Sequence, residues 1–128
     1  MLSEIIAQIK RKWSREAVLK FLNEVRSLLP PSEDFGISLI KKGVHEYVLD
    51  KQGIVIISLN QDEYLPFFAA RGKRIDLEKL SDDILLEISK NWRNIISQLR
   101  DILLEYGRRD DKYLKVAEEI TGIIFENI

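Results

Sequence analysis

The clearest signal of this chain's fold is the stretch ISLIKKGVHEYVLDKQGIVIISL, residues 37–59. It contains three short segments rich in β-branched residues, 37–40, 44–50 and 53–59, and turns that contain glycine separate them. Links this short join antiparallel neighbours, because a parallel pair of strands needs a long crossover. We therefore expect a three-stranded antiparallel meander, with 53–59 as its central and best-buried strand because this segment is apolar on both faces.

Upstream of the meander, apolar residues recur at steps of three and four positions, which predicts a helix over residues 3–29. Pro30 and Pro31 end this helix, because proline supplies no backbone donor and restricts the residue before it. Ser14 offers a second helix start if the helix breaks near Trp13.

Downstream of the meander, the same helical spacing predicts one long helix over residues 76–106 and a last helix over residues 111–127. Gly107 fits the C′ position of the first of these helices, and Asp110 or Asp111 can cap the second. Because the link between the two helices is short, we expect them to form an antiparallel hairpin.

These elements form a single α+β domain over residues 1–128. It contains an N-terminal helix within 1–30, a small β subdomain over 37–75 with a short helix after its third strand, and the helical hairpin of 76–128. A chain of 128 residues with 45% hydrophobic residues has the length of one ordinary domain and can bury a core.

The composition narrows the class of protein. The formal net charge is −1, so no global field draws the chain to nucleic acid or to a membrane. There is no cysteine, which excludes disulfides and thiolate chemistry, and no apolar run approaches the ~20 residues that span a bilayer. No signal-peptide pattern is present, so we expect an intracellular, cytoplasmic protein. One methionine, 32% charged residues and much isoleucine are typical of a thermophile.

The chain shows no signature of an enzyme or of a metal site. Its one histidine, His45, lies in a predicted strand, and no serine lies in a nucleophile-elbow pattern. The acidic pairs Asp82-Asp83 and Asp110-Asp111 stand where helices begin, so capping explains them better than cation binding does. We therefore expect no catalytic residue, no metal, no cofactor and no small-molecule substrate.

Basic residues form two clusters that are candidates for nucleic-acid contact. They are Lys10, Arg11, Lys12 and Arg15 in the first helix, and Arg71, Lys73 and Arg74 after the meander. Arg11 and Arg15 are one helical turn apart, so they can reach neighbouring phosphates. The alternative is that these charges face solvent without a ligand, since charged residues opposite an apolar stripe usually face water.

The C-terminal helices carry wide apolar stripes, which we interpret as the candidate surface for a protein partner or a second copy. The candidate contact row is Trp92, Ile95, Leu99, Ile102, Tyr106, Ile120 and Ile124. Some of these residues must belong to the chain's own core, and the spacing does not tell which ones.

A further candidate site is QDEYLPFF, residues 61–68, which has the outline of a peptide that docks on a sliding clamp. In that interpretation, the residues that fill the clamp's pockets are Gln61, Tyr64, Phe67 and Phe68. The alternative is structural: Asn60 with Glu63 forms a capping box, and a short helix ends at Gly72. Burial of the two phenylalanines, worth roughly 2–3 kcal/mol each, favours the structural alternative.

The stretch 47–77 combines an aromatic residue, a turn with glycine, an apolar strand that ends in leucine, a short helix, and Arg-Gly followed by a basic and an apolar residue. In this order, the features are Tyr47, Gly53, Val55 to Leu59, Leu65 to Ala70, Arg71-Gly72-Lys73 and Ile75. The pattern resembles the small β-domain of archaeal GINS-type subunits, and the helices that follow match the subunit type whose β-domain comes first. Asn60 stands where the family usually has proline. The resemblance implies a non-enzymatic scaffold of a DNA replication complex that binds sister subunits and the replicative helicase.

We therefore expect a non-catalytic protein–protein interaction or scaffold subunit of the GINS-like kind. The alternatives are a small nucleic-acid-binding protein that uses the basic N-terminal helix, and a sliding-clamp-binding protein that uses residues 61–68.

Overall fold

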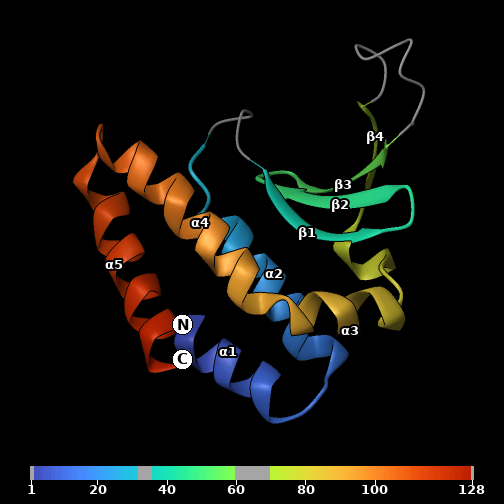
Figure 1. The fold of residues 1–128 in the computed structure, drawn as a ribbon, viewed down its shortest axis with the longest axis horizontal. Helices are drawn as coiled ribbons and strands as arrows, with labels where there is room; N and C mark the ends of the chain where they lie inside the picture. Colours follow the sequence, from blue (N-terminus) through green and yellow to red (C-terminus); the bar gives the residue numbers. More distant parts are fainter. Residues whose placement is uncertain (1, 32–35, 60–69, 128) are drawn as a thin grey trace.

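The computed structural model describes residues 2–31, 36–59 and 70–127, and it has a mixed α+β fold, as predicted (Figure 1). The candidate clamp-binding residues Gln61, Tyr64, Phe67 and Phe68 lie outside the described residues. The same holds for the short helix expected over 65–70, except for its last residue, which belongs to a strand.

The N-terminal region forms two helices, α1 (Leu2–Arg11) and α2 (Arg15–Leu28), so the prediction of one helix over 3–29 is wrong. The helix breaks because Ser14 has an extended backbone, and its hydroxyl accepts a hydrogen bond from the backbone N–H of Ala17 at 3.3 Å. Ser14 is therefore the N-cap of α2, which confirms the alternative of a second helix start. The link turns α1 back so that it packs beside α2.

The sheet has four antiparallel strands in the order β1-β2-β3-β4 (Figure 1). Their bounds are β1 (Ile37–Lys42), β2 (His45–Asp50), β3 (Gly53–Leu59) and β4 (Ala70–Ile75). The first three strands form the expected meander, and the fourth corrects the expected number of strands. The sequence of β4, ARGKRI, holds mostly small and charged residues, so its pairing with β3 depends on backbone hydrogen bonds rather than on a local strand pattern.

One face of the sheet belongs to the core, and the other is only half-buried. Ile37, Leu49 and Ile54 lie in register across three strands and are fully buried. Val55 and Ile57, on the opposite face of β3, are half-buried. The strand β3 is therefore flanked on both sides, as a central strand should be, but it is not buried on both faces, because the helices pack against the face that holds Ile54.

Four helical segments follow the sheet in the chain. They are the 3-10 turn η1 (Leu77–Lys79) and the helices α3 (Asp82–Lys90), α4 (Trp92–Gly107) and α5 (Asp111–Glu126). The prediction of one helix over 76–106 is wrong, because the chain bends at Asn91, whose side-chain amide donates a 2.6 Å hydrogen bond to the carbonyl of Leu39 in β1. The antiparallel hairpin, formed by α4 and α5, is confirmed (Figure 1).

The hydrophobic core joins both helical regions to the inner face of the sheet. Its largest fully buried side chains are Ile6, Phe21, Leu22, Ile37, Leu39, Leu49, Ile54, Leu85, Ile88, Ile95, Ile96 and Leu99. The two chain ends lie close together beside α1 (Figure 1). Within the described part of the chain, no helix is long and apolar enough to cross a membrane.

Candidate interaction surfaces

Four of the seven residues predicted to contact a partner belong to the chain's own core. Ile95, Leu99 and Ile120 are 0% exposed, and Trp92 is 9% exposed, so the prediction is wrong for these four. The physical reason is that α4 packs against both β1 and α5, which together cover most of its wide apolar stripe.

The other three residues of that row are Ile102, Tyr106 and Ile124, and each is half-buried. The ring of Tyr106 meets the ring of Tyr113 edge to face, with centroids 5.1 Å apart, across the α4–α5 hairpin. A partner contact at these three positions stays a prediction.

Arg15, one of the predicted phosphate contacts, is engaged within the chain. Its guanidinium donates hydrogen bonds to the carbonyls of Leu80 at 2.7 Å and Glu78 at 2.5 Å, and it forms an ion pair with Asp82 at 2.9 Å. These contacts fasten the start of α2 to the turn before α3. Arg15 is therefore a structural residue, and pairing it with Arg11 as a phosphate-binding unit is wrong.

The second basic cluster lies on β4, at an edge of the sheet. Arg74 donates two hydrogen bonds to the carboxylate of Asp50, at 2.9 and 2.8 Å. This contact is the main reason why the pKa of Asp50 lies below its usual value and why the pKa of Arg74 is raised. A pair this exposed contributes at most about 1 kcal/mol to stability.

Arg71 and Lys73 lie on the same strand as Arg74, far from the basic end of α1 (Figure 1). The structure therefore does not bring the two predicted basic clusters together, and only the cluster on α1 gains further cations from other elements.

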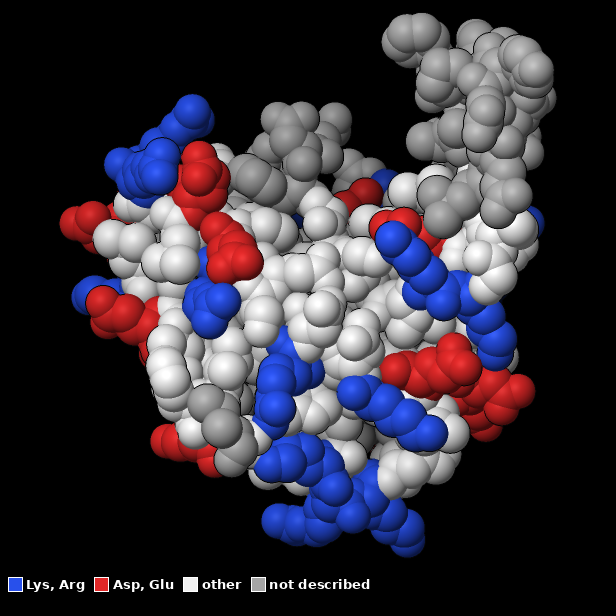
Figure 2. Space-filling view, in the orientation of Figure 1, with Lys and Arg blue, Asp and Glu red and all other residues white. Residues whose placement is uncertain are grey.

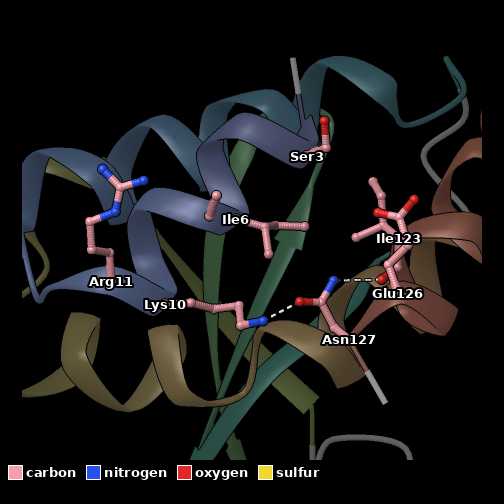
Figure 3. A pocket seen from close by; sticks show the side chains of 8 residues that line it. Ser3, Ile6, Lys10, Arg11, Ile123, Glu126 and Asn127 are labelled. Atoms are coloured by element: carbon pink, nitrogen blue, oxygen red, sulfur yellow. Dashed lines mark hydrogen bonds between the residues drawn. The ribbon is translucent and has the colours of Figure 1, made fainter.

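Lys10 and Arg93 meet around the ring of Trp92. The Nζ atom of Lys10 lies 5.8 Å from the ring centroid, and the guanidinium carbon of Arg93 lies 5.3 Å from it. Both side chains also donate hydrogen bonds to Asn127, Lys10 to its side-chain oxygen and Arg93 to its backbone carbonyl. Figure 3 shows Lys10 reaching from α1 to Asn127 at the end of α5. The end of α1 is thereby held against the start of α4.

Arg11, Lys12 and Lys20 line a hollow of about 500 Å³ beside the link between α1 and α2. Trp13, in that link, lines the same hollow and is 38% exposed. Glu16 is the one carboxylate among the lining residues of this hollow. Three cations and one aromatic ring therefore border a concave surface of the size typical of ligand sites, about 300–1,000 Å³.

We call Lys10, Arg11, Lys12, Lys20 and Arg93 the basic patch. Among residues 2–31, 36–59 and 70–127, no carboxylate lies within ion-pairing distance of any of these five side chains. Figure 2 shows Lys and Arg side chains gathered over α1 and the start of α4 on the lower part of this face. Unpaired cations held side by side repel one another, so they favour an anionic ligand.

Sequence reasoning missed Lys20 and Arg93. Each is a single basic residue in a helix of mixed charge, and Arg93 directly follows an apolar anchor of α4. No local pattern links either residue to the end of α1, because the link is made by Trp92 and by the hollow beside Trp13.

The remaining polar candidates have local roles. His45 is exposed on β2, and its Nδ1 atom lies 3.4 Å from the hydroxyl of Ser58 on β3. Asp110 caps α5, since its carboxylate accepts a hydrogen bond from the backbone N–H of Lys112 at 3.2 Å. In the part of the chain that the structure describes, no three residues with metal-binding side chains come together.

No known protein family, no characterised protein and no solved structure matches the chain. The resemblance to GINS-type subunits therefore stays a prediction.

Proposed function

We propose that this protein is a non-catalytic binding protein that contacts the phosphate backbone of nucleic acid through the basic patch. The observation that carries the proposal is the gathering of five cations from α1, α2 and α4 with no carboxylate paired to any of them in the described chain. Lys and Arg that neutralise phosphates release condensed counterions, which drives binding of nucleic acid regardless of sequence.

The net charge of −1 makes this attraction local rather than global. The affinity should therefore depend on direct contacts at the basic patch and should fall steeply with salt, since screening acts within about 10 Å at 0.1 M. A scaffold role in a DNA replication complex, and clamp binding through residues 61–68, stay predictions from the sequence.

The proposal is tested by fluorescence anisotropy with labelled oligonucleotides at salt concentrations from about 50 to 200 mM. The variant Arg11→Glu/Lys12→Glu should bind at least about tenfold more weakly at the lowest salt. Its affinity should also depend less on salt, because each lost phosphate contact on a single strand lowers the slope of log K against log salt by about 0.7.

A matched control is Arg109→Glu/Lys115→Glu, which changes the net charge by the same amount. Both residues are exposed, and they lie in the turn before α5 and in its first half, away from the end of α5 that meets the basic patch. This control should keep the wild-type salt slope. Equal losses in the two double variants would overturn the proposal, as would a wild-type protein that binds no oligonucleotide at low salt.

A further inference from the structure

Trp13 is the large aromatic side chain with the highest exposure near the basic patch. It is 38% exposed, whereas Trp92 is 9% exposed. In the described part of the chain, no other aromatic ring and no cation stacks on the Trp13 ring. An indole face is therefore left open to a ligand at the edge of the hollow described above.

The link that carries Trp13 is short and held at both sides. Before it, the backbone N–H of Lys12 donates to the carbonyl of Gln8 at 3.3 Å, which continues the last turn of α1. After it, the Ser14 hydroxyl caps α2 through the backbone N–H of Ala17. The indole thus sits on a capped turn between two helices, so little conformational freedom is lost when a ligand binds it.

The groups beside Trp13 suit one unit of a nucleic-acid strand. Arg11, Lys12 and Lys20 supply cations for phosphates, and the open ring supplies a face for a base. Proteins that bind single strands combine a positively charged groove with aromatic side chains on which bases stack. Glu16 opposes phosphate from one side of the hollow, so the strand should run along the cations of the other side.

A duplex cannot use this arrangement fully, because its bases are stacked within the helix and present only edges and phosphates to a protein. We infer that the basic patch takes single-stranded nucleic acid, with Trp13 as the stacking platform for one unpaired base. This inference rests on the proposed function, and it adds the form of the ligand and the residue that distinguishes it.

The experiment compares three probes of equal length, about 15 nucleotides. They are an oligothymidine strand, an abasic strand with the same phosphates, and a blunt duplex. Wild-type protein should bind oligothymidine more tightly than the other two probes. Trp13→Ala should weaken oligothymidine binding by about 5- to 100-fold and leave the other two affinities unchanged within about twofold. Trp13→Phe, which keeps an aromatic face, should retain most of the affinity.

The salt slope separates stacking from phosphate contact. Trp13→Ala should keep the wild-type slope, since it removes no cation, whereas Arg11→Glu/Lys12→Glu should reduce it. A second readout needs no variant: oligothymidine should quench the tryptophan fluorescence of the wild-type protein more than the abasic strand does at equal saturation. Circular dichroism and thermal melting of both Trp13 variants check that they are folded.

Three outcomes would overturn the inference and leave the proposed function standing. They are equal affinity of the wild-type protein for oligothymidine and the abasic strand, equal quenching by these two probes, and unchanged oligothymidine binding by a folded Trp13→Ala. Failure of the wild-type protein to bind any of the three probes at low salt would instead overturn the proposed function itself.

Discussion

At the scale of single residues, two glycines in the C-terminal hairpin have opposite surroundings. A Cβ atom added to Gly107 would lie 2.4 Å from the Cδ2 atom of Leu114, whereas one added to Gly122 would have no neighbour within 4 Å. Gly107 is the last residue of α4 and not its C′ residue, as the sequence predicted. It is needed there for the close approach of α5, while Gly122 only lowers the helix propensity of α5.

Substitution of these glycines by alanine should therefore change stability in opposite directions. Gly122→Ala should raise the free energy of unfolding by about 0.5–1 kcal/mol, because alanine costs less backbone entropy in a helix. Gly107→Ala should lower it by about 1–3 kcal/mol, because Leu114 must move. Urea denaturation followed by circular dichroism measures both. A stabilising Gly107→Ala would contradict the packing of α4 on α5.

At the scale of elements, side chains of the α3–α4 region bind the edge strand β1. The side-chain carbonyl of Gln98 accepts a hydrogen bond from the backbone N–H of Ser38 at 2.9 Å, and its amide donates to the Ser38 carbonyl at 2.8 Å. Asn91 donates to the carbonyl of the next residue, Leu39. These amides take the place of a further strand, so this part of the edge is covered and cannot pair with another chain.

Removal of the Gln98 amide should expose this edge. Gln98→Ala should lower the free energy of unfolding by about 1–3 kcal/mol, because it leaves two partly buried backbone groups of Ser38 without partners. Amide hydrogen exchange at Ser38 should become faster. The control Ser97→Ala removes only a bond to the carbonyl of Arg93 within α4 and should have little effect on either measurement. Unchanged exchange at Ser38 in Gln98→Ala would contradict the role of Gln98.

At the scale of the whole molecule, charges are sorted between two surfaces. The basic patch lies around the end of α1, whereas Glu4, Glu24, Glu119 and Glu126 line a separate groove between α1, α2 and α5 that no Lys or Arg of the described chain lines. Glu126 also borders the hollow that contains Lys10 and Arg11 (Figure 3). An anionic strand is therefore confined to the side of α1 away from α5, in line with a short binding site.

The molecule also has one core in place of a core and a separate apolar contact row. Leu99→Ala should lower the free energy of unfolding by about 2–5 kcal/mol, because Leu99 is fully buried in the chain and the change leaves a cavity. Leu104→Ala, at a position that is 45% exposed on the same helix, should change it by less than about 0.5 kcal/mol. Chemical denaturation measures both values. Sedimentation should give the wild-type mass for each variant, and a stable Leu99→Ala protein of lower mass would contradict this assignment.

The local elements could be predicted from the sequence because their causes are local. Apolar spacing indicated the helices and the three strands of the meander, and Ser14 was recognised as a second helix start because capping involves neighbours only a few residues away. The strand β4 could not be predicted, because ARGKRI has no strand pattern and becomes a strand only through its pairing with β3. The bend at Asn91 likewise coincides with a contact to β1, far away in the sequence.

The candidate site divides in the same way. The sequence by itself determined the mixed α+β class, the helical hairpin and the basic run of Lys10, Arg11 and Lys12, since each is a pattern of neighbouring residues. Only the tertiary structure decided that Arg15 is engaged within the chain and that Arg93 joins the basic patch. The reason is physical: spacing along a helix tells which side chains share a face, but packing between distant segments decides whether that face meets the core, an internal partner or water.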